Sequence, residues 1–341
     1  MTGRYLEVEP GSLRIREEEG RPLPEGWARI RVEACGICGT DLHLLHGMDL
    51  PRGCSYPVRP GHEVAGTVVE GELGEVRPGA AVVLHPLLPC GECAACRAGF
   101  ENRCRTAHAL GIDDPGGLAD EVLWPISRMV LRAGVGSSEA AVLADAVASA
   151  HHALDLASLP PGGSLTVLGA GGVGTHILQL ARLRDPEARL TAVVRSRPTA
   201  ERLSRLRLDV ELVDGLAGCG RRIFETRGPQ DAVIEFGAGA EAAAEGPPML
   251  ARGGRLVLGS ISPAPVELGT TLTALVTREL QVLGSYTSTL ADLAAVTRLA
   301  SSGCLDLSAS VSHVVPLDEA ARAFELLEAR PPGLARVVVR P

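Results

Sequence analysis

Hydrophobic and polar positions alternate in short runs over the first part of the chain. A clear example is Trp27-Ala28-Arg29-Ile30-Arg31-Val32, and glycines and prolines separate the runs over residues 1–60. A period of two directs one face of a strand toward a core. The same reasoning predicts strands at 63–70 and 80–84, joined through a Pro78-Gly79 turn. The first part of the chain is therefore expected to be a compact β structure.

Beyond about residue 160, short apolar runs alternate with segments of helical period. The runs lie at 164–168, 190–194, 210–213, 231–236, 255–259 and 279–285. This alternation predicts a parallel, doubly wound sheet. Before it, an alanine-rich stretch is expected to be helical, with Ser137 or Ser138 as its N-cap.

Length and composition limit the classes of protein to which the chain can belong. A chain of 341 residues with 45% hydrophobic residues can fill the cores of two domains. The net charge of −8, without a basic tail, argues against a nucleic-acid or anionic-membrane partner. The chain has no apolar run long enough to span a bilayer, and its start lacks a signal-peptide core, so a cytoplasmic location is expected. All 33 basic residues are arginine, which excludes a lysine base or Schiff base.

Chemistry-bearing side chains gather in two motifs with the sequences GICGTDLH and GHE. Cys38 and His62 are ligand types that zinc accepts. A catalytic zinc also needs a carboxylate that orients its ligands and a hydroxyl beside its open position, and Asp41 and Thr40 could fill these roles. The alternative is a reduced cysteine with two hydrogen-bonded histidines, which the combined spacing disfavours.

Four further cysteines have the spacing C-x-x-C-x-x-C-x7-C on a loop rich in glycine, alanine and arginine. Four thiolates this close in sequence can complete a tetrahedral shell that leaves no open position, which predicts a structural zinc site. A redox or iron–sulfur site is the alternative. Without metal the loop has little to bury and is expected to loosen. The predicted ligands are Cys90, Cys93, Cys96 and Cys104.

A glycine-rich sequence, GAGGVG, follows the apolar run 164–168 and precedes a helical pattern. A G-x-G-x-x-G motif between a strand and a helix is typical of a dinucleotide-binding turn. Its first glycine permits the tight turn, its second lets the backbone approach a pyrophosphate, and its third lets helix and strand pack closely. The amides at the helix start are expected to meet the phosphates. The predicted cofactor-binding residues of the turn are Gly169, Gly171, Gly172, Val173 and Gly174.

The next strand, 190–194, ends without the acidic residue that NAD enzymes carry there to accept hydrogen bonds from the adenosine ribose. Arg195, Ser196 and Arg197 occupy this region instead. An acid would repel the 2′-phosphate of NADP, whereas a hydroxyl between two guanidinium groups would bind it. The segment therefore predicts a preference for NADP(H), with NAD(H) as the alternative cofactor.

The GICGTDLH and GHE motifs resemble those of the zinc-containing medium-chain alcohol dehydrogenases, and the resemblance covers essentially the whole chain. It implies an α/β fold with a GroES-like β-barrel catalytic domain over residues 1–146, which carries a structural zinc lobe at about 88–106. A Rossmann domain with a doubly wound parallel sheet would bind NADP over residues 147–286. Residues 287–341 would return to the catalytic domain.

For the catalytic site, the resemblance implies that Cys38 and His62 bind zinc, that Thr40 contacts the substrate hydroxyl and that His43 ends a proton relay. Asp145, in the alanine-rich helix, matches the family's third protein ligand, although the best-known alcohol dehydrogenases have cysteine there. In polyol and sugar relatives the acid of the GHE motif can ligate directly. The third ligand is therefore either Asp145 or Glu63.

The resemblance also assigns residues in the second half of the chain. Gly237, Gly259 and Ser260 fall at strand ends that the family's cofactor passes. Arg336 matches a family arginine that can reach the cofactor, and a structural role for it is the alternative. The run 279–285 matches the family's last Rossmann strand, which often pairs subunits.

The resemblance implies reversible hydride transfer between an alcohol and NADP(H), with one catalytic and one structural zinc per chain. The reverse reaction would reduce an aldehyde or ketone. A polyol, sugar or threonine dehydrogenase of the same family is the alternative enzyme, and a nucleotide-binding relative without catalysis is the alternative outside enzymes. The expected partners are a small-molecule substrate and further copies of the chain, in a homodimer or homotetramer.

Overall fold

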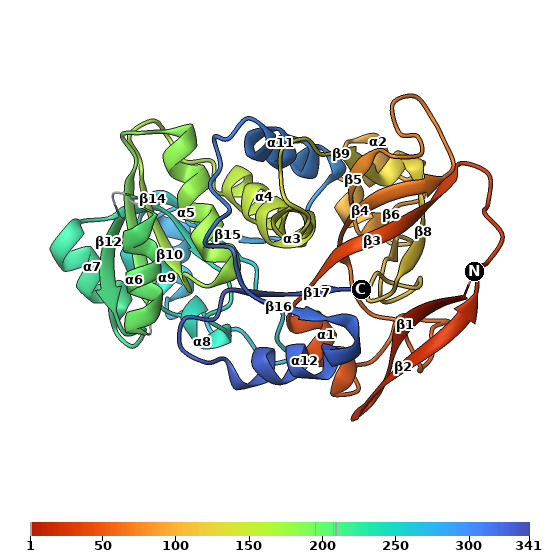
Figure 1. Cartoon of the computed structure of the whole chain (residues 1–341). Helices are drawn as coiled ribbons and strands as arrows, with labels where there is room; N and C mark the ends of the chain where they lie inside the picture. Colours follow the sequence, from red (N-terminus) through yellow and green to blue (C-terminus); the bar gives the residue numbers. More distant parts are fainter. Residues whose placement is uncertain (1, 195, 207, 209) are drawn as a thin grey trace. The chain divides into compact units, whose positions relative to one another are not determined.

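The computed structural model describes residues 2–194, 196–206, 208 and 210–341 (Figure 1). It divides into two compact units. Unit 1 comprises Met1–Ala148 together with Ser288–Pro341, and unit 2 comprises Ser149–Thr287. Each unit has its own sheet and its own core, and each is described by itself.

Unit 1 is built on a seven-stranded sheet in which the C-terminal strands lie beside β3 (Figure 1), while the N-terminal strands β1 and β2 form a separate two-stranded sheet. The strand order is β16-β17-β3-β4-β5-β9, and β8 also pairs with β3. Only β16 and β17 pair in parallel; the other described pairs are antiparallel. The strands are β3 (Trp27–Ile37), β4 (Glu63–Glu70), β5 (Ala81–Leu84), β8 (Glu121–Pro125), β9 (Met129–Leu131), β16 (Val311–Pro316) and β17 (Arg336–Arg340).

The alternation in the sequence explains how this sheet forms its core. Ala28, Ile30 and Val32 of β3 are buried on one side, while the residues between them are more accessible. Val337 and Val339 of β17 belong to the same core cluster. The strand predicted at 63–70 is confirmed with the same bounds as β4. The alternating run 27–32 lies within the longer strand β3, and the strand predicted at 80–84 corresponds to the slightly shorter β5. C-terminal residues therefore complete a core that N-terminal strands begin.

Smaller elements surround this sheet. The alanine-rich segment forms a helix that begins at Ser137, but its N-cap is Gly136 and makes no side-chain cap bond, so the predicted serine cap is wrong. The other elements with unit 1 residues are β1 (Thr2–Glu9), β2 (Ser12–Glu19), α1 (Gly39–Leu45), β6 (Leu87–Leu88), α2 (Ala94–Arg97), η1 (Glu101–Arg103), β7 (His108–Ala109), η2 (Ile126–Arg128), α3 (Ser137–Val142), η3 (Leu143–Val147), α11 (Leu290–Ser301), η4 (Leu317–Glu319) and α12 (Ala320–Ala329).

Unit 2 contains a six-stranded parallel sheet with the order β12-β11-β10-β13-β14-β15. Numbered within the unit, this is the 3-2-1-4-5-6 order of a dinucleotide-binding Rossmann fold. The order reverses between β10 and β13, and ligands of such sheets bind at the carboxyl ends of the strands near that point. The strands are β10 (Ser164–Leu168), β11 (Arg189–Val194), β12 (Val210–Asp214), β13 (Gln230–Glu235), β14 (Leu250–Leu258) and β15 (Gln281–Gly284).

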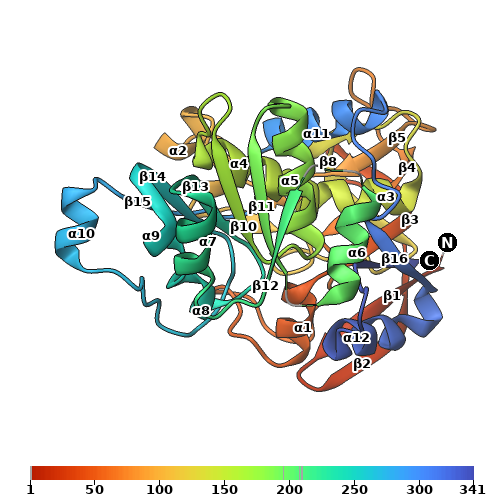
Figure 2. The ribbon, with the colours of Figure 1, turned by 90° about the vertical axis from the view of Figure 1, so that its left-hand side faces the viewer.

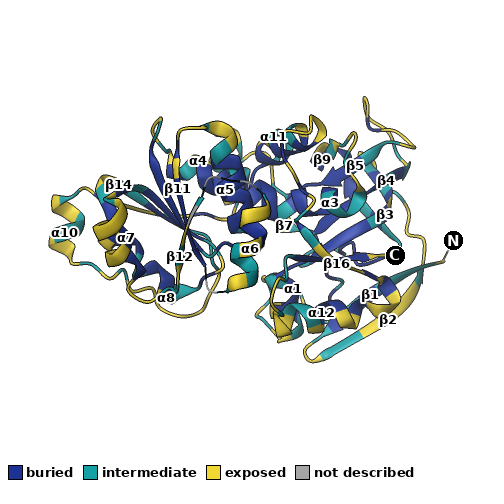
Figure 3. Ribbon diagram, turned by 60° about the vertical axis from the view of Figure 1, so that its left-hand side comes forward, coloured by how far each residue is buried: buried dark blue, intermediate teal, exposed yellow. Residues whose placement is uncertain are grey.

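Helices pack on these strands (Figure 2). The helix α5 contacts β10 and β11, α6 contacts β11, and α9 contacts β13 and β14. Figure 3 shows that the sheet is largely buried, whereas α7 and α10 carry exposed surface. The helices with unit 2 residues are α4 (Ala148–Ala157), α5 (Gly172–Arg184), α6 (Arg197–Arg205), α7 (Cys219–Arg227), α8 (Ala240–Ala243), α9 (Gly246–Met249) and α10 (Leu272–Thr277). In the part of the chain that the structure describes, no helix is long and apolar enough to cross a membrane.

Candidate active site

Cys38 lies where β3 ends and α1 begins, and a reciprocal capping box fixes it there. Its Sγ accepts a hydrogen bond from the Thr40 N–H at 3.4 Å, and its own N–H donates to the Asp41 carboxylate at 2.9 Å. The other carboxylate oxygen of Asp41 accepts from the Gly61 N–H at 3.2 Å. Asp41 is fully buried and thus fastens the GICGTDLH and GHE motifs to each other through their backbones.

Four candidate metal ligands meet within unit 1. The ligand atoms of Cys38, His62, Glu63 and Asp145 all lie within 4.8 Å of one another. Cys38 Sγ is 3.2 Å from His62 Nε2, which is 3.9 Å from Asp145 Oδ2. The structure therefore brings together residues from three separate stretches of sequence.

Sheet register explains how Glu63 reaches this cluster. Gly36 on β3 lies opposite both Glu63 on β4 and Val338 on β17. Opposite residues of an antiparallel pair point to the same face, as do residues two apart on one strand. Arg336 therefore shares the face of Glu63. A Cβ at Gly36 would lie 2.2 Å from Glu63 Oε2, so the absence of a side chain at Gly36 leaves room for the carboxylate.

Asp145 lies in η3, one π-helical turn between the α-helices α3 and α4. Such turns are rare within helices and are frequent at functional sites, because the extra residue redirects neighbouring side chains. Ala144 and Ala146 on either side are fully buried, while the side chain of Asp145 retains 22% of its accessible surface. A sequence of helical period alone does not reveal this turn.

Arg336 contacts both carboxylates of the cluster. Its Nη1 is 2.9 Å from Glu63 Oε1 and its Nη2 is 3.5 Å from Asp145 Oδ2. Burial raises the pKa of Glu63 to about 8, although the Arg336 guanidinium acts in the opposite direction. The structure thus places Arg336 at the candidate metal ligands, whereas the sequence predicted either a contact with the cofactor or a structural role.

The donor set fits a zinc ion. Tetrahedral zinc with bonds of about 2.3 Å to sulfur and about 2.0 Å to nitrogen holds those two atoms about 3.5 Å apart, close to the 3.2 Å between Cys38 and His62. Both carboxylate oxygens of Glu63 are buried; Oε1 is paired with Arg336, and Oε2 accepts no hydrogen bond from the described residues. Buried carboxylate oxygens of this kind are expected to have a cation nearby.

Thr40 and His43 both lie on α1, three residues apart. Thr40 is half-buried beside Cys38, and His43 is exposed to solvent. Residues three apart lie on one face of a helix. The partly buried Thr40 thus lies two residues after the candidate ligand Cys38 in sequence, and the exposed His43 lies one helical turn further along.

The four cysteines of the lobe form a second candidate metal centre. The lobe lies in the sequence between the short strands β6 and β7. Its sulfur–sulfur distances include 3.4 Å for Cys93–Cys96, 3.6 Å for Cys90–Cys104 and 3.9 Å for Cys90–Cys96. Tetrahedral zinc–thiolate geometry requires about 3.8 Å. Backbone amides of Glu92 and Cys93 lower the pKa of the Cys90 thiol, which favours the thiolate. The described cysteines are all free, so the lobe is not a disulfide cluster.

The glycine-rich turn in unit 2 has the close contacts that its motif predicts. Gly169 has a φ of +94°, and a Cβ there would lie 2.6 Å from the Phe236 carbonyl oxygen. A Cβ at Gly174 would lie 2.1 Å from the Gly169 carbonyl oxygen. Gly171 is the N-cap of α5, and Gly172 and Val173 begin the helix. The turn therefore requires glycine at its first and last positions.

The predicted 2′-phosphate segment follows β11. Arg195 lies outside the described residues. Ser196 is the N-cap residue of α6, and its hydroxyl is 3.0 Å from Thr199 Oγ1. The Arg197 side chain is 89% exposed and pairs with Glu201 at 3.0 Å.

Two other predicted cofactor positions are joined by a buried acid that the sequence reasoning missed. Glu235 ends β13, and its Oε1 accepts hydrogen bonds from the Ser260 hydroxyl at 2.6 Å and the Ala238 N–H at 2.9 Å. The Gly237 N–H donates to the Ser260 hydroxyl oxygen at 2.8 Å. Gly259 directly follows β14 and precedes that serine. The loops after β13 and β14 are thus connected through one carboxylate.

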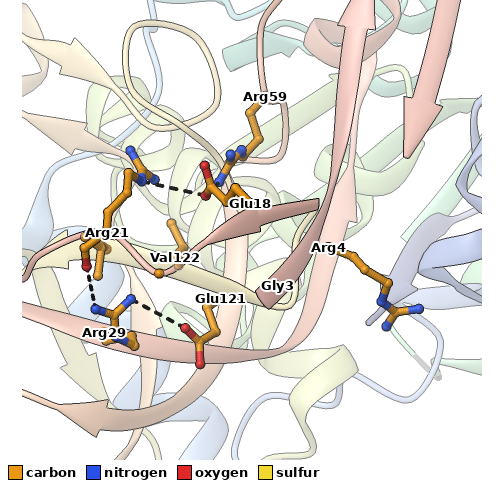
Figure 4. Close-up of a pocket in the computed structure, with 10 residues that line it drawn as sticks. Gly3, Arg4, Glu18, Arg21, Arg29, Arg59, Glu121 and Val122 are labelled. Carbon is orange, nitrogen blue, oxygen red and sulfur yellow. Dashed lines mark hydrogen bonds and ion pairs between the residues drawn. The ribbon is translucent and has the colours of Figure 1, made fainter. Parts of the chain in front are cut away.

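A small pocket elsewhere in unit 1 carries several arginines (Figure 4). Its guanidinium groups are engaged: Arg59 pairs with Glu18 at 2.6 Å, and Arg29 pairs with Glu121 at 3.5 Å. Arg29 also donates to the Arg21 carbonyl at 2.7 Å. The first pair joins β2 to the loop before β4, and the second joins β3 to β8. With these charges paired, we read the pocket as a structural junction and not as a second candidate active site.

Comparison with known proteins identifies the family. Residues 24–133 match the family model "Alcohol dehydrogenase GroES-like domain". An NAD-dependent alcohol dehydrogenase of Saccharolobus solfataricus is 31% identical over 338 residues, which cover 94% of this chain and 95% of the relative. The chain belongs to the medium-chain alcohol dehydrogenase family. It is therefore an oxidoreductase of the alcohol dehydrogenase type, as its motifs predicted.

Other proteins similar to this chain differ in their named substrate and cofactor. The 2-dehydro-3-deoxy-L-galactonate 5-dehydrogenase of Pseudoalteromonas atlantica is 31% identical, with 92% of this chain and 91% of the relative covered. A crystal structure of a putative zinc-binding dehydrogenase from Sinorhizobium meliloti bound to NADP superposes with a TM-score of 0.88 at 28% identity, with both chains fully covered. The predicted fold class, a GroES-like domain with a Rossmann sheet, is thereby confirmed.

Proposed function

We propose that this dehydrogenase transfers a hydride reversibly between an alcohol and NADP(H) at a zinc ion bound by Cys38, His62 and a carboxylate. The observation that carries the proposal is the meeting of thiolate, imidazole and carboxylate donors within 4.8 Å of one another. When bound, zinc supplies a Lewis acid that favours the alkoxide of an alcohol and polarises a carbonyl group. The nicotinamide supplies the hydride chemistry.

We assign the third ligand to Asp145. Arg336 lies closer to Glu63 than to Asp145, at 2.9 Å against 3.5 Å, so Glu63 has the nearer counter-charge. Asp145 Oδ2 already lies 3.9 Å from His62 Nε2. In this assignment Asp145→Asn lowers the zinc content of the catalytic centre strongly, and Glu63→Gln lowers it less. Elemental analysis after brief chelation measures both, and the reverse order would favour Glu63 as the ligand.

Thr40 and His43 are the proposed proton path. Thr40 lies next to Cys38 and is half-buried, so its hydroxyl is suited to relay a proton: it takes one from a bound alcohol as it passes its own on, with His43 at the outer end of the relay. His43 is exposed three residues later, so its imidazole ring can pass a proton on to water. In this scheme Thr40→Val lowers kcat far more than His43→Gln does, because water can replace the outer group.

The proposed cofactor preference is for NADP(H). The missing acid after β11 and the hydroxyl at the start of α6 support it. Ser196→Asp would introduce a carboxylate that repels the 2′-phosphate, and Ser196→Asn is the uncharged control of similar shape. We expect Ser196→Asp to invert the ratio of kcat/KM for NADPH to that for NADH, while Ser196→Asn retains it. A wild-type preference for NADH would contradict the proposal.

The four-cysteine lobe is proposed to hold one structural zinc per chain. Its sulfur–sulfur distances of 3.4 to 3.9 Å for the pairs given above match tetrahedral thiolate ligation. Together with the catalytic site, this gives two zinc ions per chain. Elemental analysis of the wild type and of Cys104→Ser should differ by one zinc per chain.

A polyol or sugar is the second candidate substrate for the same zinc-dependent hydride transfer. The carboxylate of Asp145 in place of the family's frequent cysteine favours it, as does the sugar-acid dehydrogenase among the relatives. A panel of simple alcohols, polyols, sugars and threonine with NADP separates these substrate classes. Turnover of polyols well above simple alcohols would establish the second candidate.

We also propose that the protein forms a homodimer or homotetramer through β15. This strand ends the sheet of unit 2, and an unpaired edge strand is an aggregation liability. Val282 on β15 is an exposed apolar side chain, and the segment between β14 and β15 exposes three more, namely Ile261, Leu272 and Val276. Light scattering of the purified chain should give two or four subunits, and Val282→Lys should lower that number.

The experiment that tests the proposed activity compares Cys38→Ser with Cys304→Ser. Cys38 is buried among the metal ligands, whereas Cys304 is an exposed cysteine outside the cluster. We expect Cys38→Ser to abolish NADPH-linked aldehyde reduction while NADPH still binds, and Cys304→Ser to leave both unchanged. Activity that survives in Cys38→Ser, or a zinc count that does not exceed the structural site, would favour a nucleotide-binding protein without catalysis.

A further inference from the structure

Arg202 makes an unexpected contact with the glycine-rich turn of unit 2. It lies on α6, after the predicted 2′-phosphate segment, and only 9% of its surface is accessible. Its Nη2 donates to the Ala170 carbonyl oxygen at 2.9 Å and lies 3.3 Å from Thr175 Oγ1. The guanidinium therefore contacts both the turn and the helix α5 that follows it.

These contacts fix the orientation of one peptide group. In a trans peptide the carbonyl of one residue and the N–H of the next point in opposite directions. Because Arg202 holds the Ala170 carbonyl toward α6, the Gly171 N–H is directed to the opposite side of the turn. Thr175 supports the same arrangement, since its hydroxyl is 2.8 Å from the Gly171 carbonyl oxygen and its N–H donates to that oxygen at 3.1 Å.

The amides presented in this way are the ones a dinucleotide needs. The first four N–H groups of a helix have no partner within the helix, and they bind phosphate groups in dinucleotide-binding turns. Gly171 is the N-cap of α5, so its peptide lies at that end of the helix. A carbonyl turned outward here would repel a pyrophosphate instead of binding it.

The charge of Arg202 acts in the same direction. Burial lowers the pKa of the guanidinium, yet an arginine remains protonated in proteins. A positive charge beneath the turn adds to the positive end of the α5 dipole. Ser196 is the N-cap of the same helix α6, so Arg202 also connects the segment that would bind the 2′-phosphate to the turn that would bind the pyrophosphate.

We infer that Arg202 is a positioning residue for the cofactor, which holds the Ala170 carbonyl so that the amides of the glycine-rich turn face the pyrophosphate. The inference rests on the proposed binding of a nicotinamide dinucleotide in unit 2. Arg202 acts through the turn and not on the reacting atoms. It therefore affects NADPH and NADH alike, because both contain the pyrophosphate.

The test measures dissociation constants of the full-length, zinc-loaded enzyme for NADPH, NADH and adenosine 2′-monophosphate, which lacks the pyrophosphate. Arg202→Met removes the charge and the hydrogen bonds, and Arg205→Met is the matched control, since Arg205 is exposed on the same helix. We expect Arg202→Met to raise both dinucleotide dissociation constants about 10- to 100-fold, the range for loss of a charged hydrogen bond. Binding of adenosine 2′-monophosphate should change much less, and Arg205→Met should bind like the wild type.

Kinetics and a conservative variant separate positioning from a general structural defect. Arg202→Met should raise the KM for the cofactor while kcat at saturation stays near that of the wild type. Arg202→Lys retains a charge but not the fork geometry, so it should restore part of the lost affinity. If Arg202→Met folds poorly, Arg202→Lys decides the question, because a several-fold loss for both dinucleotides is still expected.

Three results distinguish the possible failures. Wild-type affinity for both dinucleotides in Arg202→Met or in Arg202→Lys would overturn the inference. A loss confined to NADPH would also overturn it, because Arg202 would then act on the 2′-phosphate. A wild-type protein that binds neither dinucleotide would instead refute the proposed function.

Discussion

His85 makes the stability of unit 1 depend on pH. The residue follows β5 and is fully buried. Its Nδ1 lies 2.7 Å from Arg128 Nη2 and 3.3 Å from the Leu87 N–H, so Nδ1 must accept hydrogen bonds. Its Nε2 lies 3.1 Å from the Ser288 carbonyl oxygen and must therefore carry the proton that donates to it. This assignment from partners makes the imidazole neutral, and a second proton would confront Arg128.

The size of the effect follows from the pKa. Burial and then the charge of Arg128 lower the pKa of His85 from 6.5 to about 4. Because the folded state binds fewer protons than the unfolded state between these values, the contribution of His85 is complete above pH 6.5. It decreases as the pH falls and is lost near pH 4. The whole shift corresponds to about 3 kcal/mol, of which about 2 kcal/mol is lost between pH 8 and pH 5.

Urea unfolding at pH 8 and pH 5 measures this loss. Trp124 donates its Nε1–H to the His85 carbonyl at 2.9 Å and provides a fluorescence signal next to the site. In the comparison variant, His85→Asn, the amide oxygen can still accept from Arg128 but does not titrate. The wild type should lose about 2 kcal/mol more than the variant over this pH interval.

Protonation of the zinc ligands affects both proteins equally and cancels in that difference. Equal losses in the wild type and in His85→Asn would show that His85 is not held neutral. The reasoning from burial and from the Arg128 contact would then be refuted.

Three further substitutions test the glycine-rich turn, the role of Asp41 and the four-cysteine lobe. Gly174→Ala brings a Cβ within 2.1 Å of the Gly169 carbonyl oxygen, so titration should show at least about a tenfold weaker affinity for NADPH, and unchanged binding would contradict it. Asp41→Asn disturbs the hydrogen bonds that its carboxylate accepts from the Cys38 and Gly61 amides; competition with a chelator should show about 10- to 100-fold weaker zinc binding at the catalytic site. Cys104→Ser should lower the thermal unfolding midpoint, and an unchanged midpoint would mean that the lobe is stable without metal.

Patterns that act over a few residues were readable from the sequence. The strand at 63–70 has the predicted bounds, although its first four residues are all buried and burial alternates only over its second half. The spacing of Cys90, Cys93 and Cys96 brings their sulfur atoms together within one loop. The glycine turn 169–174 follows its strand and begins its helix as predicted. Each of these features depends on neighbours in the chain.

Local signals misled or were absent where the backbone departs from a regular pattern. Ser137 was expected to cap its helix, but Gly136 occupies that position. The π-helical turn at Asp145 leaves no mark in a run of alanine and valine, because each residue there is compatible with an ordinary α-helix. Glu235 was missed since its partners Ala238 and Ser260 lie in two loops that only the sheet brings together.

The sequence by itself determined which donors this alcohol dehydrogenase carries and how the closest of them are spaced. The tertiary structure decided which charges meet. Arg336 reaches Glu63 because β17 and β4 flank β3 in one register, across a position where glycine leaves space. Contacts between residues hundreds of positions apart depend on strand order and register. Strand order and register follow from the burial of apolar side chains of distant strands in one shared core, and no short motif encodes them.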